Sequence, residues 1–160
     1  MSVNLEPYDI DIKVFDTFAQ LFKNYLFKTI SNNNTCSENP CLLNFLLSRR
    51  NRFSKSYLNN VIHILILLNK YGRLRLSELS EILNMNPGAL HNYVEELCEN
   101  GFLEIERNGI RTVYVKSNEN TKRALSDLKN IVNGILEVIE KEKNSVVQIY
   151  ELLNKMVSKE

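Results

Sequence analysis

The sequence predicts a mainly α-helical protein with one small β-hairpin. Over most of the 160 residues, apolar side chains recur every three or four positions, which is the period of amphipathic helices. Between Leu103 and Val115 the apolar residues alternate instead, on either side of Asn108-Gly109. Asn-Gly between alternating apolar runs is the strongest short-range hairpin signal, because both central residues of a type I′ turn need positive φ. We therefore expect a tight type I′ turn at this position.

Two short helices are expected directly before the hairpin. The first begins with Ser77 as its N-cap and ends before Asn84. The second begins at Pro87, because the Asn86 side chain can accept amide hydrogens of the first turn and proline loses no hydrogen bond at the first helical position. Gly101 ends it, since glycine adopts the left-handed conformation that closes helices. A tight polar turn therefore joins the two helices.

The second helix has two faces of different chemistry. Its apolar residues Leu90, Val94, Leu97 and Cys98 form the stripe expected to be buried. The opposite stripe carries Gly88, His91, Asn92, Glu95 and Glu99. The hairpin that follows has Arg107 and Arg111 beside its turn, as a DNA-contacting wing would. Helix, turn, helix and basic hairpin in this order predict a winged helix-turn-helix flanked by N-terminal and C-terminal helices.

This segment resembles the winged-helix repressors of the MarR, PadR and ArsR type, from roughly Tyr57 to Ile139. Their pattern is a leucine-rich helix, a polar turn, a second helix ending in leucine, asparagine-glycine-hydrophobic and a basic wing. The resemblance implies a dimeric transcription regulator, with a short strand near Arg73 that pairs with the wing. The matching residues are Leu79, Ile82, Leu90, Val94, Leu97, Asn100-Gly101-Phe102-Leu103, Arg107 and Arg111.

Long apolar helices are expected on both sides of a winged helix-turn-helix domain at residues 56–117. Residues 1–55 form a helical extension with a basic linker, and residues 118–160 a dimerisation region interrupted at 142–145, where Ser145 caps a last helix. One small domain cannot bury both flanking faces, so they are expected to pair in a homodimer; packing on each other within one chain is the alternative. The predicted dimer interface consists of Phe15, Phe18, Phe22, Leu125, Leu128, Val132, Ile135 and Ile139.

Charge is segregated along the chain although the net charge is only +1. Residues 41–76 contain seven basic residues and no acid, residues 77–106 contain seven glutamates and no Lys or Arg, and residues 107–116 add three basic residues. This pattern favours one basic surface formed by the wing and the approach to the first helix. A merely solvated linker at residues 48–52 is the alternative. Because the second helix carries no cation, affinity for phosphates must come from outside it.

The predicted function is a sequence-specific regulator that binds double-stranded DNA. His91 and Asn92 approach base edges, and Gly88 permits close approach. Arg107 and Arg111 hold phosphates or enter the minor groove, while the other arginines neutralise the DNA backbone. The predicted DNA-binding residues are Asn86, Gly88, His91, Asn92, Arg107, Arg111, Arg73, Arg75, Arg49, Arg50, Arg52 and Lys55.

Other functions find less support in the sequence. It has two histidines, five glycines and no nucleophile elbow, phosphate loop or zinc spacing, so neither an enzyme, a metal site nor a cofactor is expected. It lacks a secretory signal and a membrane-length apolar run, so we expect a cytoplasmic protein with no membrane partner. Cys36 and Cys41 are either a redox-responsive pair or unrelated thiols, and Cys98 is expected to pack.

Two further alternatives stay open at this point. The aromatic N-terminal helix either packs as core or subunit contact, or lines a pocket for a small-molecule effector of unknown identity. The whole chain could also be a winged-helix protein interaction module without direct DNA readout, which the seven-glutamate segment favours.

Overall fold

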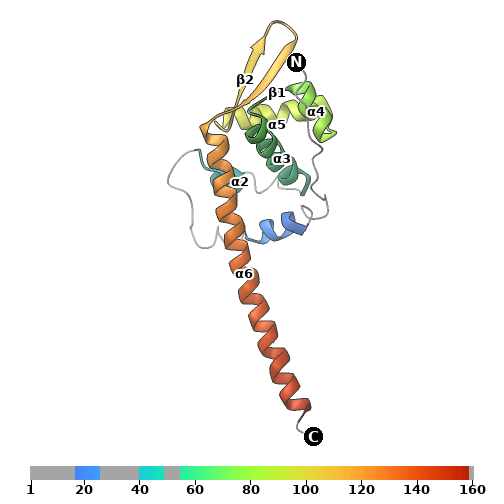
Figure 1. Ribbon diagram of the computed structural model, residues 1–160, viewed down its shortest axis with the longest axis vertical. Coiled ribbons are helices and arrows are strands. Elements are labelled where there is room, and N and C mark those ends of the chain that lie inside the picture. The colour runs from blue at the N-terminus through green and yellow to red at the C-terminus, as the bar shows by residue number, and fades with distance from the viewer. Residues whose placement is uncertain (1–16, 26–39, 49–54, 159–160) are drawn as a thin grey trace.

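The computed structural model describes residues 17–25, 40–48 and 55–158. Residues 17–25 are helical. The elements that follow are α2 (Leu42–Ser48), α3 (Lys55–Tyr71), β1 (Arg73–Arg75), α4 (Leu76–Leu83), α5 (Pro87–Glu99), β2 (Leu103–Asn108), β3 (Thr112–Ser117) and α6 (Glu119–Val157). The sheet and the shorter helices gather at one end, and α6 extends away from them as a long rod (Figure 1). The predicted fold class, mainly α with a small hairpin, is confirmed.

The three strands form one antiparallel sheet in the order β1-β3-β2. Leu74 of β1 and Ile105 of β2 both pair with Val115 of β3. Leu74 and Val115 are buried, so this face of the sheet covers the core. Because successive side chains of a strand point to opposite faces, Arg73 and Arg75 lie on the other, exposed face. The short strand that was expected to pair with the wing is therefore present.

Helix α3 forms the centre of the core. Leu58, Ile62, Leu65 and Leu68 recur at helical spacing on it and are at most 1% exposed. The helix contacts α6, β1 and β3. It ends at Tyr71, and the next residue, Gly72, has a positive φ of 77° and donates its N–H to the Leu68 carbonyl oxygen at 2.8 Å.

Helix α6 is continuous over 39 residues. The expected interruption at residues 142–145 is wrong, and Ser145 caps no helix, because its hydroxyl donates to the Lys141 carbonyl oxygen one turn earlier. Residues 140–143 are all glutamate or lysine, which are good helix formers and do not break a helix. None of the helices in the described ranges is long and apolar enough to cross a bilayer.

The first half of α6 completes the hydrophobic core. Ala124, Ile131 and Ile135 on it are buried together with Phe22 from residues 17–25. The blue helical segment in Figure 1 lies beside the middle of α6. The two helices approach so closely that a Cβ added to Gly134 would lie 2.6 Å from the Tyr25 hydroxyl oxygen. The absence of a side chain at Gly134 therefore gives the Tyr25 ring its room against α6.

This packing corrects part of the predicted dimer interface. Phe22 is fully buried and Ile135 is 5% exposed within a single chain, so neither side chain can face a partner. Phe18, Leu125, Leu128 and Ile139 pack partly buried against the same core, Val132 is half-buried, and Phe15 lies outside the described residues. The helical period identified the apolar side of α6 but could not tell a core neighbour from a second copy.

A buried threonine ties the start of α6 to the sheet. The Thr121 hydroxyl donates to the Phe102 carbonyl oxygen at 2.6 Å and accepts from the Asn118 N–H at 3.0 Å, while the Asn118 side chain caps the helix in return. Thr121→Val keeps the shape of the side chain and leaves both groups unsatisfied. We expect it to lower the free energy of unfolding by about 1–3 kcal/mol in chemical denaturation. Thr121→Ser, which keeps the hydroxyl, should cost less; equal stability of Thr121→Val and wild type would contradict this role.

Candidate nucleic-acid interface

The turn between α4 and α5 is fixed by its polar residues. The N-cap of α4 is Arg75, two residues before the expected Ser77, and its side chain makes no cap hydrogen bond, so the prediction of Ser77 as N-cap is wrong. Because β1 ends at Arg75 and α4 begins at Leu76, the last residue of the strand occupies the N-cap position. Asn84 then ends α4 in the left-handed conformation, with φ of 48°. The Ser80 hydroxyl donates to the Met85 carbonyl oxygen at 2.6 Å and holds the turn closed.

Helix α5 starts as the sequence predicts. Its N-cap is Asn86, whose Oδ1 accepts from the Gly88 N–H at 2.8 Å, and Pro87 follows at the first helical position. A Cβ at position 88 would lie 3.2 Å from this Oδ1, so a glycine gives the cap its room. Asn86 and Gly88, both expected at DNA, thus also set the start of the helix. Gly101 closes α5 beyond Asn100 with φ of 85°.

The inner face of α5 is held by apolar packing and by a polar edge. Leu90, Val94 and Leu97 are fully buried, as predicted. At the edge, the Tyr57 hydroxyl donates to Glu96 at 3.3 Å and the Asn60 amide donates to the Tyr93 hydroxyl at 3.2 Å. Both bonds join the second half of α5 to α3.

The outer face of α5 is polar and open. Asn92 is exposed, and the His91 side chain is 41% exposed. His91 Nε2 lies 3.8 Å from a Glu95 carboxylate oxygen one turn later. Helix α5 contains no Lys or Arg, so this face offers amide, imidazole and carboxylate groups only. Such groups can hydrogen-bond base edges but do not attract phosphates.

The hairpin turn differs from the expected one. Asn108 pairs with Thr112, so the loop holds three residues, Gly109, Ile110 and Arg111. Gly109 has φ of 76°, whereas Asn108 is not in the positive-φ region. The type I′ prediction is therefore wrong, because that turn needs positive φ at both residues. Ile110, expected among the apolar residues of the strand, lies in the loop and is 103% exposed.

Arg107 and Arg111 lie beside the tip of this hairpin. Both are exposed, and within the described part of the chain neither has an ion-pair partner. Residues 107–118 contain no acid. The wing tip, which we define as residues 107–112, is therefore a cationic loop with an apolar apex.

Arg73 and Arg75 do not join the wing tip. Arg107 pairs with Val113, one position away from Tyr114, so it lies on the opposite face of the sheet from Arg73 and Arg75. The expectation that these arginines join the wing arginines on one side of the sheet is wrong for this pair. Strand register decided this, and register cannot be read from charge order alone.

The exposed sheet face is a cluster of paired charges around one aromatic ring. The Arg73 guanidinium lies 3.8 Å from the centroid of the Tyr114 ring and 3.4 Å from Glu106. Arg75 lies 3.6 Å from Glu78 and donates to the Tyr114 hydroxyl at 3.4 Å, a bond that raises the pKa of Arg75. These cations are already balanced by carboxylates. The sequence reading missed Tyr114, which only the pairing of β1 with β3 brings beneath both arginines.

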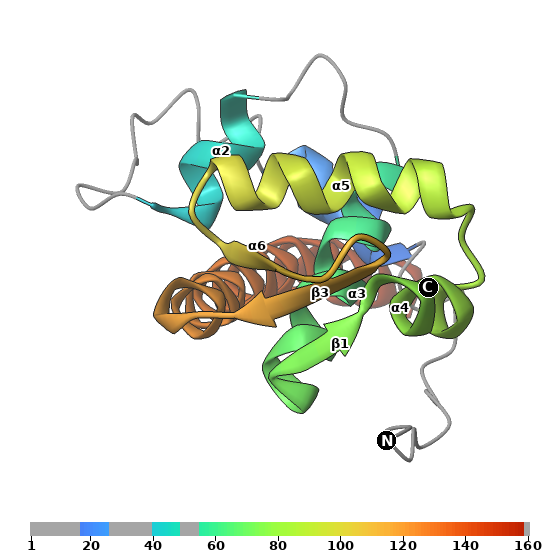
Figure 2. The same cartoon turned by 90° about the horizontal axis from the view of Figure 1, so that it is seen from above.

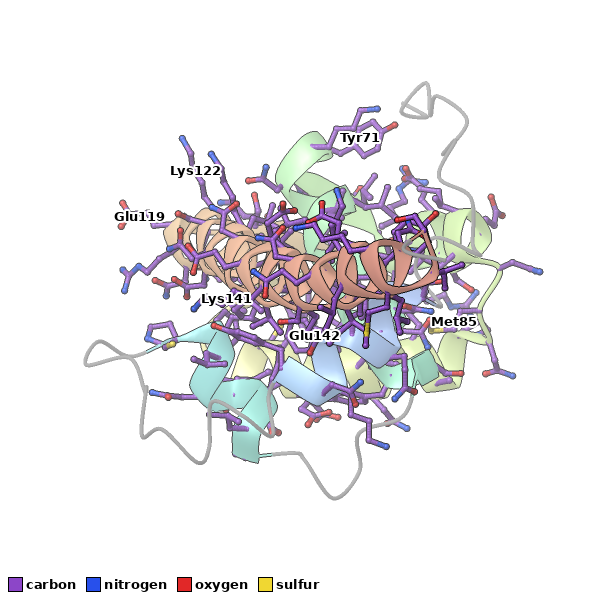
Figure 3. All side chains as sticks on the ribbon, turned by 90° about the horizontal axis from the view of Figure 1, so that it is seen from below. Tyr71, Met85, Glu119, Lys122, Lys141 and Glu142 are labelled. Carbon is purple, nitrogen blue, oxygen red and sulfur yellow. The ribbon has the colours of Figure 1, made fainter. Side chains whose placement is uncertain are left out.

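The structure does not describe the side chains of the four remaining predicted DNA-binding residues. Arg49, Arg50 and Arg52 lie outside the described residues, as does the side chain of Lys55, the first residue of α3. The predicted convergence of three basic segments is therefore not observed among the described residues, because Arg73 and Arg75 lie on the opposite face of the sheet from Arg107. Figure 2 looks onto this end, where α5 crosses the view; Figure 1 shows that the hairpin projects beyond α5, which contacts β2. From the opposite end, α6 lies in front of the other elements, and Lys141 and Glu142 are labelled on it (Figure 3).

The cysteines carry different chemistry. Cys41 is buried at the start of α2 and disulfide-bonded, which disfavours an unrelated thiol at that position; Cys36 lies outside the described residues. Burial raises the pKa of the Cys98 thiol to about 11, and Glu104, Glu95 and Glu99 add to this effect. Cys98 is therefore protonated at neutral pH and packs against the core. Among the described residues, no group of three metal-ligating side chains occurs.

A cavity of about 370 Å³ lies between residues 17–25 and α6. Among the aromatic residues of the N-terminal helix, Tyr25 lines this cavity, whereas Phe22 lies in the core. The Phe18 ring packs edge-on against Phe22, with 5.6 Å between the ring centroids. A small-molecule pocket here therefore stays a prediction. Its lining residues are Leu21, Asn24, Tyr25, Ile135, Val138, Ile139 and Glu142.

Comparison with known proteins identifies the domain around α5. A family described as winged helix-turn-helix DNA-binding matches residues 59–104. A comparison with curated proteins found no match. One similar solved structure is a transcriptional regulator homologue from Pyrococcus horikoshii OT3, with 23% identity and a TM-score of 0.41, covering 47% of this chain and 81% of that one. A MarR transcriptional regulator from Methanosarcina mazei Go1 has 17% identity and a TM-score of 0.47, covering 90% of this chain and 89% of that one. A mutant of ZitR from Lactococcus lactis in complex with DNA has 20% identity and a TM-score of 0.39, covering 62% of this chain and 69% of that one. Residues 59–104 thus match a winged helix-turn-helix family, and the resemblance inferred from the sequence is confirmed as a winged helix-turn-helix in this part of the chain.

Proposed function

We propose that the protein is a transcription regulator that binds double-stranded DNA sequence-specifically as a homodimer. The observation that carries this proposal is the presence of two surfaces at one end of the molecule: the open, cation-free face of α5 and the acid-free wing tip, which projects beyond it. One can hydrogen-bond bases and the other can hold phosphates. Neither surface would bind DNA specifically and tightly without the other.

The division of labour follows from the side chains. His91 and Asn92 lie in the N-terminal half of α5, where a reading helix meets base edges in the major groove. An asparagine amide can donate and accept at the same time, which suits the paired donor and acceptor of adenine. Arg107 and Arg111, without carboxylate partners, supply the charge that attracts the phosphate backbone. The Glu95 carboxylate lies on the same face, 3.8 Å from His91 Nε2.

The distal part of α6 supports the homodimer. Every residue from position 140 to 158 is exposed. Val146, Ile149, Leu153 and Met156 follow each other in steps of three, four and three, with exposed fractions between 54 and 69%. This is the spacing of a two-helix seam. An isolated helix of this length is marginal in water, so a second copy of the same stripe is the partner that stabilises it.

The proposal is tested by selecting duplexes from a random pool with the wild-type protein and measuring their affinity at several salt concentrations. We expect a recurring inverted repeat, with half-sites about one helical turn apart, bound at least about 1,000-fold more tightly than random duplex. Affinity should fall steeply as salt rises, because phosphate contacts release counterions. A pool that shows no enrichment, or binding that hardly responds to salt, would refute the proposal.

Asn92→Ala tests the reading helix by itself. The side chain is exposed, so the fold should not change, while the loss of a bidentate base contact should weaken binding to the selected duplex by roughly 10-fold or more. Affinity for random duplex should stay within about twofold, since that affinity depends on phosphates. The measurement is the ratio of the two affinities. Equal weakening of both would show that Asn92 contacts the backbone instead of a base.

A protein interaction module is the second candidate. The exposed carboxylates of Glu95 and Glu99 on α5 favour it, since acids that face DNA are unfavourable. Size-exclusion chromatography separates the two functions. No shift with any selected duplex, together with a stable complex with another protein, would support the interaction module over the regulator.

A further inference from the structure

The apex of the hairpin carries an apolar side chain that touches nothing in its own chain. Ile110 is 103% exposed, and it is the central residue of the three-residue loop between Asn108 and Thr112. Gly109 before it has no side chain, so the isoleucine stands alone at the tip. In Figure 1 the hairpin extends beyond the other elements at this end of the molecule. Ile110 therefore contributes nothing to the core and is free to enter a partner.

The surroundings of Ile110 define the chemistry of that partner. Arg107 and Arg111 lie on either side of it, and no acid occurs between positions 107 and 118. The closest preceding carboxylate, Glu106, lies on the opposite face of the sheet from Arg107 and pairs with Arg73 at 3.4 Å. The tip thus presents one apolar wedge between two uncompensated cations. It fits a polyanion that has a narrow apolar space between its charged edges.

The minor groove of duplex DNA has this arrangement. Its two edges are phosphate backbones, its walls are sugars, and apolar side chains such as isoleucine can enter between base steps and unstack them. An anionic bilayer also combines charge and apolar volume, but one isoleucine buries too little apolar area to hold a loop in it. The place of the hairpin favours DNA: β2 contacts α5 and the tip projects beyond it, so a wing that extends from a helix in the major groove can reach the adjacent minor groove.

We propose that Ile110 is a wedge that enters the minor groove and bends the DNA that the protein binds. This inference rests on the proposed function, since it needs a duplex held by α5 and the wing arginines. Arg107 and Arg111 fix the tip between the two backbones, and Ile110 opens one base step below it. Pyrimidine–purine steps such as TA unstack most easily, so the wedge also selects sequence at a position that α5 does not touch.

The experiment measures bending and binding on the same duplex. The wild-type protein, Ile110→Ala and Ile110→Leu are titrated into a selected duplex that carries a donor and an acceptor dye at its two ends. Because Ile110 makes no contact in its own chain, none of the variants should lose stability. We expect wild type and Ile110→Leu to shorten the end-to-end distance, and Ile110→Ala to bind within about 10-fold of wild type while leaving the duplex straight. Replacing the TA step below the tip by a stiff A-tract should weaken wild type more than Ile110→Ala.

The possible outcomes separate this inference from the proposed function. Equal bending by wild type and Ile110→Ala would overturn the wedge and leave DNA binding intact. Failure of the wild-type protein to bind any selected duplex would remove the proposed function and the wedge together. A third outcome is that the wild-type protein binds no DNA but binds vesicles with anionic lipid, and that Ile110→Ala does not bind them. That result would assign the tip to a membrane surface and would also overturn the proposed wedge.

Discussion

The double variant Arg107→Ala, Arg111→Ala is expected to bind its selected duplex about 10- to 100-fold more weakly than the wild-type protein at moderate salt. Both side chains are exposed at the wing tip, without carboxylate partners within the described ranges, so their full charge is available to phosphates. Each phosphate contact contributes about 0.9 to the slope of log affinity against log salt, so the slope should decrease by about two. Affinity measured by fluorescence anisotropy at four or five salt concentrations gives both quantities.

A charge-matched control keeps this result interpretable. Lys141→Ala with Lys143→Ala also removes two exposed cations, but from the distal part of α6, at the end opposite the wing. This variant should lose only the small long-range attraction, which salt screens. If both double variants weaken binding equally, only net charge matters and the wing arginines are not phosphate contacts.

The second large effect concerns the oligomeric state. Ile149→Glu with Leu153→Glu places two carboxylates in the exposed apolar stripe of α6, where they would face the same residues of a second copy. Burial of like charges against each other is strongly unfavourable, so we expect a monomer in sedimentation equilibrium where the wild type is a dimer. Affinity for an inverted repeat should fall on the order of 100-fold, because two linked half-sites are no longer bound together.

The matched control for the stripe is Asn144→Glu with Gln148→Glu. It adds the same charge at the same spacing of four residues, but on the polar side of the helix. We expect this variant to stay a dimer and to keep its thermal stability. A monomeric wild type, or equal dissociation of the two variants, would show that the stripe has another partner.

The helix ends that depend on local sequence signals are predicted most reliably. Asn86 before Pro87 gave the start of α5, and Gly101 gave its end, because these residues favour their backbone conformations whatever surrounds them. The errors arose where two local preferences competed. Ser77 is a good cap, yet the strand before it enters the helix directly, and Asn108-Gly109 favours a type I′ turn, yet the strand register leaves a three-residue loop.

The candidate site was only partly predictable. Periodicity placed His91 and Asn92 on the exposed side of α5, since its buried residues recur every three or four positions. Which arginines act together was not predictable. Arg73 and Arg75 are close in sequence to α4 and belong by charge to the basic group, but the pairing of β1 with β3 turns them to a face where Glu78 and Glu106 balance them.

The sequence by itself determined that this chain contains two short helices, a polar turn and a hairpin in the order of a winged helix-turn-helix, because caps, breakers and apolar period act over a few residues. Only the tertiary structure decided which side of each element is covered. In the structure, Phe22 and Ile135 are buried in the core of the same chain, whereas residues 140–158 of α6 are exposed. Arg73 and Arg75 of β1 lie on the opposite face of the sheet from Arg107 of the wing. The reason is that an apolar stripe or a charged side chain does not specify which residue it contacts. Strand register and helix packing determine that contact when segments distant in sequence come together.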